Sequence, residues 1–256
     1  MTTIMITTMI MVMAIITIMT DRSIEPVPSI PELMRLLQFG DSMLPVGAFS
    51  FSSGLESAVQ ERVVHDLGTL RQFVRTAAEQ AATGDGIAVL EAYRGAQADD
   101  FARIVAADRA IYCRKLNEEM RTMVVRMGRK LAELALHVLP EAPVVSGWLS
   151  AIKQGTAPGS YPVGQALVFA ALKLSERDAF AVHQYGIASM MLGAALRLLK
   201  ISYLDAQAIL FEVNAAAHSA YQRVARATLD DMSAFAPVTD ILASVHVKSR
   251  VRMFMN

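Results

Sequence analysis

From Ser29 onward, apolar residues recur at intervals of three and four, and no segment between turn signals alternates cleanly between apolar and polar residues. The first pattern places apolar side chains along one face of an α-helix, whereas a half-buried strand needs a period of two. The sequence therefore predicts an all-α fold, an irregular bundle of roughly ten helices in a single domain. The expected helices cover residues 29–39, 53–62, 66–82, 86–97, 100–116, 117–139, 148–154, 162–174, 175–200, 202–226 and 237–247, with 100–139 forming either two helices or one.

Two helix starts have the pattern of a capping box. Ser29 is followed three residues later by Glu32, with Pro31 in the first turn, and Ser53 is followed in the same way by Glu56. The limits of the helical domain are placed at residues 29 and 247. An apolar leader, residues 1–28, precedes it, and a C-terminal tail, residues 248–256, follows it.

The leader is unusual because its first twenty residues contain no charge and six of the sixteen methionines. Its length is sufficient to span a bilayer. It lacks the basic start and the small-residue cleavage site of a secretory signal, and its threonines do not follow one helical face. A disordered or loosely helical extension, which start-codon choice at Met19 could explain, is favoured over a membrane anchor or a partner-binding tail.

Charge and cysteine content limit the classes of function. The 24 basic and 24 acidic residues balance, so no net field attracts nucleic acid or an anionic membrane surface. The single cysteine, Cys113, excludes an internal disulfide and a site of several thiolates, and its helical neighbours predict that it is a small buried side chain.

Motifs for catalysis or cofactor binding are absent from the sequence. The glycines near residues 84 and 155 lack the lysine and the spacing of a phosphate-binding loop, and no nucleophile elbow occurs. The histidines have no pair at four-residue spacing, so we expect no metal site within one helix. No acid stands beside a plausible base, and we therefore expect neither enzymatic activity nor a cofactor of its own.

The segment "DSMLPVGAFSFSSGLE", residues 41–56, stands out between two helical patterns. Pro45 fixes one backbone dihedral and Gly47 permits a turn that a side chain would hinder. Two interpretations remain open. The segment is either a connector whose apolar side chains Leu44, Val46, Phe49 and Phe51 fill the core, or a recognition surface on a rigid scaffold.

Three blocks of sequence resemble the urease accessory protein UreF family. "LLQFGDSMLPVGAFSFSSGLE" is similar to its N-terminal signature, and "GSYPVGQALVFAAL" and "AALRLLKISYLDAQAIL" are similar to two later blocks in the same order. The similarity extends from Leu33 to Phe254. The chain departs from the family pattern at Ala48, at Lys200 and Ser202, and in the tail, where Ser249 and Arg250 are kept.

The resemblance implies an all-helical, dimer-forming maturation chaperone without chemistry of its own. Such a protein bridges UreD (also called UreH) and the GTPase UreG on apo-urease in the cytoplasm, and nickel and GTP are handled by the partner complex. Candidate partner-binding residues are Pro45, Gly47, Phe49, Glu56, Tyr161, Pro162, Arg197, Gln207, Ser249, Arg250, Arg252 and Phe254. For Arg197, an arginine that merely extends its stem along an apolar helix is an equal alternative.

The tail is expected to become ordered on binding UreD, since a chain terminus is usually mobile until a partner holds it. Two other classes remain as alternatives. One is a helical adaptor, soluble or tethered to a membrane, for another client, and the other is a helical enzyme whose site is assembled from dispersed residues.

Overall fold

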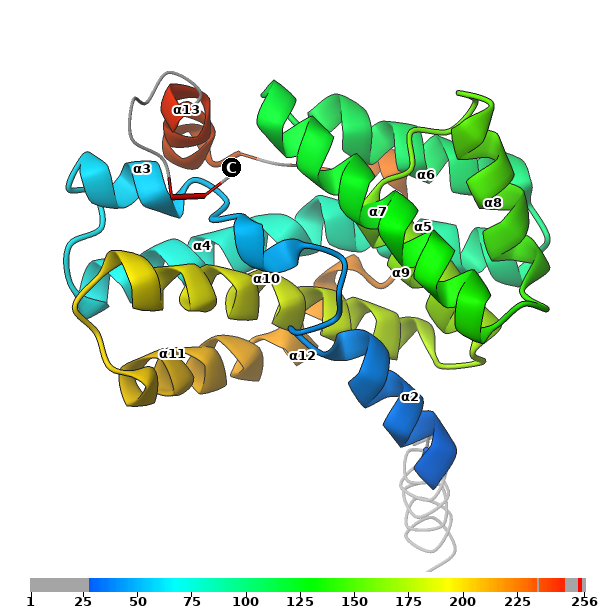
Figure 1. Ribbon diagram of the computed structural model, residues 1–256, viewed down its shortest axis with the longest axis horizontal. Coiled ribbons are helices and arrows are strands. Elements are labelled where there is room, and N and C mark those ends of the chain that lie inside the picture. Colours follow the sequence, from blue (N-terminus) through cyan, green and yellow to red (C-terminus); the bar gives the residue numbers. More distant parts are fainter. Residues whose placement is uncertain (1–27, 234, 247–252, 255–256) are drawn as a thin grey trace, which may run out of the picture. The chain divides into compact units, whose positions relative to one another are not determined.

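A computed structural model describes residues 28–233, 235–246 and 253–254, and every regular element in these residues is a helix (Figure 1). The all-α prediction is therefore confirmed. The chain divides into two units, residues 1–33 and 34–256, with the boundary inside the first described helix. The α-helices are α2 (Ile30–Gly40), α3 (Leu55–Gln60), α4 (Leu67–Thr83), α5 (Asp85–Gln97), α6 (Phe101–Arg114), α7 (Glu118–Val138), α8 (Pro143–Lys153), α9 (Tyr161–Ala171), α10 (Glu176–Leu198), α11 (Tyr203–Ala215), α12 (Ala217–Val224) and α13 (Pro237–His246), with short 3₁₀ turns η1 (Ala48–Ser50) and η2 (Leu229–Asp231).

Side-chain caps fix several helix starts where the sequence predicted them. The Ser29 hydroxyl accepts from the Glu32 N–H at 3.4 Å, and the Glu32 carboxylate accepts from the Ser29 N–H at 2.7 Å. Reciprocal boxes also begin α4, α10 and α11, at Asp66, Ser175 and Ser202. These caps satisfy N–H groups that have no partner within the helix.

The structure decides one open alternative, at residues 100–139, and differs from two other expected helices. Residues 100–139 form two helices, because Asn117 caps a new one with its side chain. Residues 202–226 are divided near Ala216 into α11 and α12. The helix expected from Trp148 begins earlier, since Pro143 occupies its first turn, a position where a proline needs no N–H partner.

The helices α5 and α9 form the centre of the second unit. Nearly every residue of α9 from Pro162 to Ala170 is buried, and α5 is buried over residues 86–92. A helix that is apolar on all sides must be covered on all sides. The helices α6, α7 and α10 pack around this pair.

Two apolar clusters stabilise this unit. The larger joins α5 through α9 around the fully buried Trp148, Phe169 and Phe180. The smaller joins α3, α4, α11 and the second half of α10, and it includes Phe254 of the tail. Helix α10 therefore contributes to both clusters. It is also the one helix in the described part of the chain with the length and composition to cross a membrane. Its apolar 18-residue stretch is 56% buried inside the protein.

One prediction about the core is wrong. Cys113 lies near the end of α6 and is exposed, not buried. Its neighbour Ile111 takes the core-facing position of that turn and is fully buried. The predicted boundaries at residues 28 and 247 border segments outside the described residues and stay predictions.

Candidate partner-binding groove

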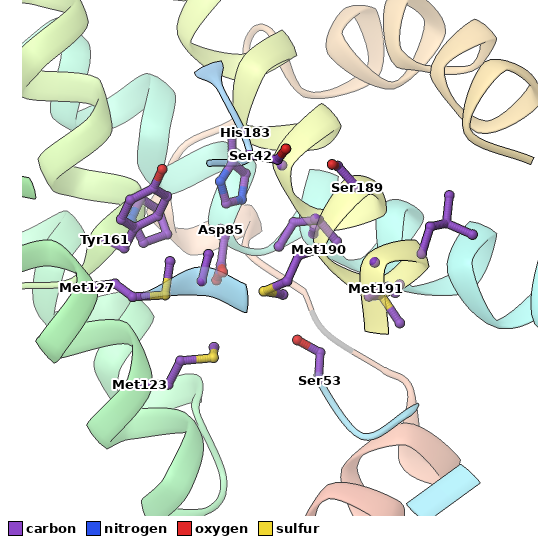
Figure 2. Close-up of a pocket in the computed structure, with 18 of the residues that line it drawn as sticks. Ser42, Ser53, Asp85, Met123, Met127, Tyr161, His183, Ser189, Met190 and Met191 are labelled. Atoms are coloured by element: carbon purple, nitrogen blue, oxygen red, sulfur yellow. The ribbon is translucent and has the colours of Figure 1, made fainter. Parts of the chain in front are cut away.

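A groove of about 530 Å³ lies beside α10 (Figure 2). Its walls come from the loop after α2, from α7, from the start of α9 and from α10 itself. Six methionines line it: Met43, Met120, Met123, Met127, Met190 and Met191. Methionine is flexible and polarizable, so a surface rich in it adapts to the shape of an apolar partner.

The loop from Asp41 to Ser53 forms one wall and contains several candidate residues. The Asp41 carboxylate accepts from the Met43 N–H at 2.8 Å, and Gly47 has a φ of 93°, as the predicted turn requires. Of the four apolar side chains that the connector interpretation places in the core, Val46 and Phe51 are buried and Leu44 is partly buried. Phe49 is 70% exposed, as the recognition-surface interpretation requires. The loop is therefore both a core connector and an exposed surface, and Pro45 lies on its exposed part.

The predicted capping box at Ser53 is wrong. Helix α3 begins after Gly54, whose φ of 83° sets the entry turn, and the N–H of Glu56 donates to the Ser52 hydroxyl at 3.3 Å. The Glu56 side chain instead points to the tail. Its carboxylate accepts from the N–H of Met253 at 2.7 Å and from the N–H of Phe254 at 3.0 Å.

Arg197 completes this contact with the tail. Its guanidinium carbon lies 4.0 Å from the ring centroid of Phe254, and its Nη2 donates to the Phe49 carbonyl at 2.8 Å. We refer to Glu56, Arg197 and Phe254 as the tail clamp. Arg197 is thus fixed by a cation–π contact and a hydrogen bond, and it ties the loop to the tail.

The start of α9 forms the other end of the groove with Tyr161 and Pro162. A buried carboxylate holds this turn in place. Asp108 accepts from the Trp148 indole at 2.9 Å and from the N–H groups of Gly159 and Ser160 at 2.9 and 2.7 Å. Burial raises the pKa of Tyr161 to about 12, so its phenol stays protonated at physiological pH.

His183 lies at the same end of the groove, with a partly buried ion pair nearby. Lys115 Nζ lies 2.7 Å from an Asp85 oxygen, and each side chain is 14% exposed. Burial lowers the pKa of His183 from 6.5 to about 4, while Asp85 opposes and Lys115 adds to that shift. The imidazole is therefore neutral at pH 7.

This histidine should make stability depend on pH. The unfolded chain binds a proton near pH 6.5 and the folded chain only near pH 4, so stability falls as pH decreases through that window. Between pH 7 and pH 5 we expect a loss of about 2 kcal/mol in the free energy of unfolding from this residue. Denaturant titrations between pH 7 and pH 5 should show that the free energy of unfolding depends less on pH in His183→Gln than in wild type. In the exposed His218→Gln this dependence should be unchanged. An equal dependence of the free energy of unfolding on pH in wild type and His183→Gln would contradict the lowered pKa of His183.

The structure brings several of the candidate residues together and leaves others apart. Phe49, Tyr161, Pro162, Arg197 and Gln207 all line the groove. Glu56 and Phe254 join them through Arg197 in the tail clamp. Pro45 and Gly47 shape the adjoining loop without lining the groove. The candidates Ser249, Arg250 and Arg252 lie outside the described residues.

The groove also contains residues that the sequence analysis did not select, among them His183, Gln165 and Gly186. Gln165 lies in the second block of family resemblance but was not selected there, no motif marks His183 or Gly186, and only the pairing of α9 with α10 places the three together. In the residues that the structure describes, no three His, Cys, Asp or Glu side chains are grouped so as to hold a metal ion. The arrangement is suited to binding an apolar partner, with a few polar contacts that set its orientation.

Comparison with known proteins gives a consistent answer. The sequence model of the UreF family matches residues 64–214. Urease accessory protein UreF 2 of Brucella canis is 54% identical over 228 residues, which cover 89% of this chain and 93% of that protein. UreF 1 of Brucella melitensis is 54% identical with 89% and 94% covered, and UreF of Yersinia pseudotuberculosis serotype I is 49% identical with 88% and 98% covered. These matches extend over nearly the whole chain, and we conclude that it belongs to the UreF family of urease accessory proteins.

Proposed function

We propose that this chain is a non-catalytic scaffold in the cytoplasm that joins UreD to the GTPase UreG on apo-urease and regulates GTP-dependent delivery of nickel. It acts as a homodimer, and nickel is its cargo, not a resident cofactor. The supporting observation is the tail clamp. It ties the tail, expected to meet UreD, to the loop and to α10, which form the groove. Contact with one partner can in this way alter the surface offered to another.

The test is to measure nickel per urease active site in cells that lack this protein, with total urease quantified in the same cells. We expect urease to accumulate with few loaded sites and full loading to return when the gene is restored. Fully loaded urease in the deleted strain would overturn the proposal. The protein would then be studied as a soluble or membrane-tethered adaptor for another client. Turnover of a substrate by the isolated chain would instead favour a helical enzyme.

The tail clamp gives a more local prediction. In Glu56→Gln, an amide replaces a carboxylate that accepts two backbone N–H groups, so one donor loses its acceptor. We expect the tail to detach more often and binding to purified UreD to weaken about tenfold, as on removal of residues 248–256. Hydrogen exchange of the C-terminal peptide should increase in the same variant.

A matched control is available at the end of the same helix. Glu61 is exposed, so Glu61→Gln removes an equal charge without touching the tail. Its binding to UreD and its C-terminal hydrogen exchange should equal those of wild type. A Glu56→Gln protein with wild-type exchange would show that the carboxylate does not hold the tail.

A further inference from the structure

Helix α11, which lies beside α10 (Figure 1), is apolar on its exposed face as well as on its buried face. The buried face contributes Ile209, Leu210 and Val213 to the smaller apolar cluster. On the opposite face, exposed residues follow one another at intervals of four, three and four: Leu204, Ala208, Phe211 and Ala215. We call these four residues the α11 row. Because a helix that is apolar on both sides is expected to be covered on both, the α11 row should have a cover outside the single chain.

The large side chains of the α11 row are strongly exposed. Leu204 is 65% exposed and Phe211 is 83% exposed, and the neighbouring Tyr203 is 69% exposed. Single apolar side chains on a surface are ordinary, but a contiguous apolar patch marks an interaction site. The spacing of the row is also that of the a and d positions along which α-helices pack in coiled coils. The α11 row is therefore suited to contact with another α-helix.

The order of large and small side chains in the α11 row indicates which helix this is. Large and small residues alternate along the row, and its midpoint lies between Ala208 and Phe211. A two-fold axis through this midpoint would pair α11 with an antiparallel copy of itself. Leu204 would then lie opposite the partner's Ala215. Phe211 would lie opposite the partner's Ala208, so every large side chain meets a small one, as close packing of two helices requires.

The charge of this surface is consistent with a second copy as the partner. The four residues of the α11 row are uncharged. Glu212, which flanks the row, pairs with Arg71 of α4, with 2.9 Å between its Oε2 and the arginine Nε. Two copies of one surface carry the same charges, so a symmetric contact must be neutral or balanced within each copy. The α11 row and its flank meet this condition, whereas a docking surface for a strongly charged partner would carry the opposite charge.

From these observations we infer that two copies of this chain associate through the α11 row, with their α11 helices antiparallel about a two-fold axis. This inference rests on the proposed function, because it assigns a surface to the homodimer named there. The row is about 16 Å long, or three helical turns. Helix α11 alone therefore covers less than the roughly 800 Å² per partner of a standard interface. We expect a reversible dimer with a dissociation constant on the order of micromolar.

The test places a charge in this contact. A symmetric dimer of Phe211→Glu or of Ala208→Lys would bury the new charge twice, each time against an apolar side chain. Sedimentation of the full-length chain from about 1 to 100 μM should show dimers for wild type and at least about tenfold weaker association for each variant. Both positions are exposed in the single chain. The thermal midpoints of the variants should therefore equal that of wild type at dilutions where wild type is monomeric.

A mixture of the two variants tests the antiparallel pairing itself. In a dimer of one Phe211→Glu chain and one Ala208→Lys chain, the new carboxylate lies opposite the new ammonium group, and the second contact is that of wild type. The mixture should therefore associate at least about tenfold more tightly than either variant alone. The matched control is Phe235→Glu, because Phe235 is also 83% exposed but lies outside α11. Its self-association should equal that of wild type.

The outcomes separate this inference from the proposed function. If wild type stays monomeric throughout this range, the homodimer and this inference fail together, while nickel loading of urease tests the maturation role independently. If wild type dimerises and both variants dimerise equally well, only the α11 contact is overturned. Variants that dimerise normally but bind purified UreD or UreG more weakly would assign the α11 row to that partner instead. Monomeric variants whose mixture does not associate would contradict the antiparallel pairing and overturn the inference as well.

Discussion

Replacing Gly128 with alanine should lower the free energy of unfolding by about 3 kcal/mol, the upper part of the range for overpacking a core. A Cβ at this position of α7 would overlap the carbonyl oxygen of Gly159 and lie 2.8 Å from the backbone nitrogen of Tyr161. These are main-chain atoms, so no side-chain rotation can remove the overlap. Helix α7 and the first turn of α9 would have to separate.

Thermal unfolding should detect this change as a decrease of roughly 10 °C in the midpoint, given the size of the chain. Gly147→Ala is the matched control, because its added methyl group makes one ordinary contact and improves helix propensity. It should leave the midpoint unchanged or raise it slightly. A Gly128→Ala protein as stable as wild type would show that α7 and α9 do not approach as closely as described here.

The second large effect is expected at Asp108. In the wild type, three N–H donors, from Trp148, Gly159 and Ser160, share the two carboxylate oxygens of Asp108. The amide in Asp108→Asn offers them only one acceptor oxygen. At least one buried N–H then faces another donor. We expect a loss of about 3 kcal/mol in the free energy of unfolding, since Asp108 is fully buried and the donor that loses its acceptor cannot turn to solvent.

Trp148 gives a direct measurement because it is the only tryptophan of the chain. Its indole binds Asp108, so the fluorescence of the native state should change in Asp108→Asn, and the denaturant midpoint should decrease. The control Glu133→Gln removes an acid from an exposed ion pair with Arg129 and should change stability by less than about 0.5 kcal/mol. Unaltered fluorescence and stability in Asp108→Asn would refute the role of this carboxylate.

Both changes should also affect the groove. Gly128 and Asp108 hold the first turn of α9, and that turn presents Tyr161 and Pro162 to the groove. Neither residue belongs to the three blocks that carry the family resemblance. Their sequence neighbourhoods are ordinary amphipathic helices, so nothing in the sequence marks them as determinants of a turn about 30 to 50 positions away.

The local features of this protein were determined by its sequence. The recurrence of apolar residues predicted the helices. Several predicted helix starts coincide with capping residues, at Ser29, Asp66, Ser175 and Ser202, because helix periodicity and capping act within a few residues. The blocks around Pro45, Tyr161 and Arg197 also gave the family, which the close relatives confirm.

What only the tertiary structure decided depends on contacts between distant segments. The sequence suggested a local cap for Glu56, yet its carboxylate binds backbone N–H groups almost 200 residues away. It left open whether Phe49 fills the core or faces a partner, and the packing of the loop leaves this ring exposed and uses its carbonyl to hold Arg197. Periodicity shows which side chains share a face of a helix, but not which other segment that face meets. The groove exists only because α9 and α10 pair, with α7 and the loop beside them, and this arrangement is set by packing of the whole core.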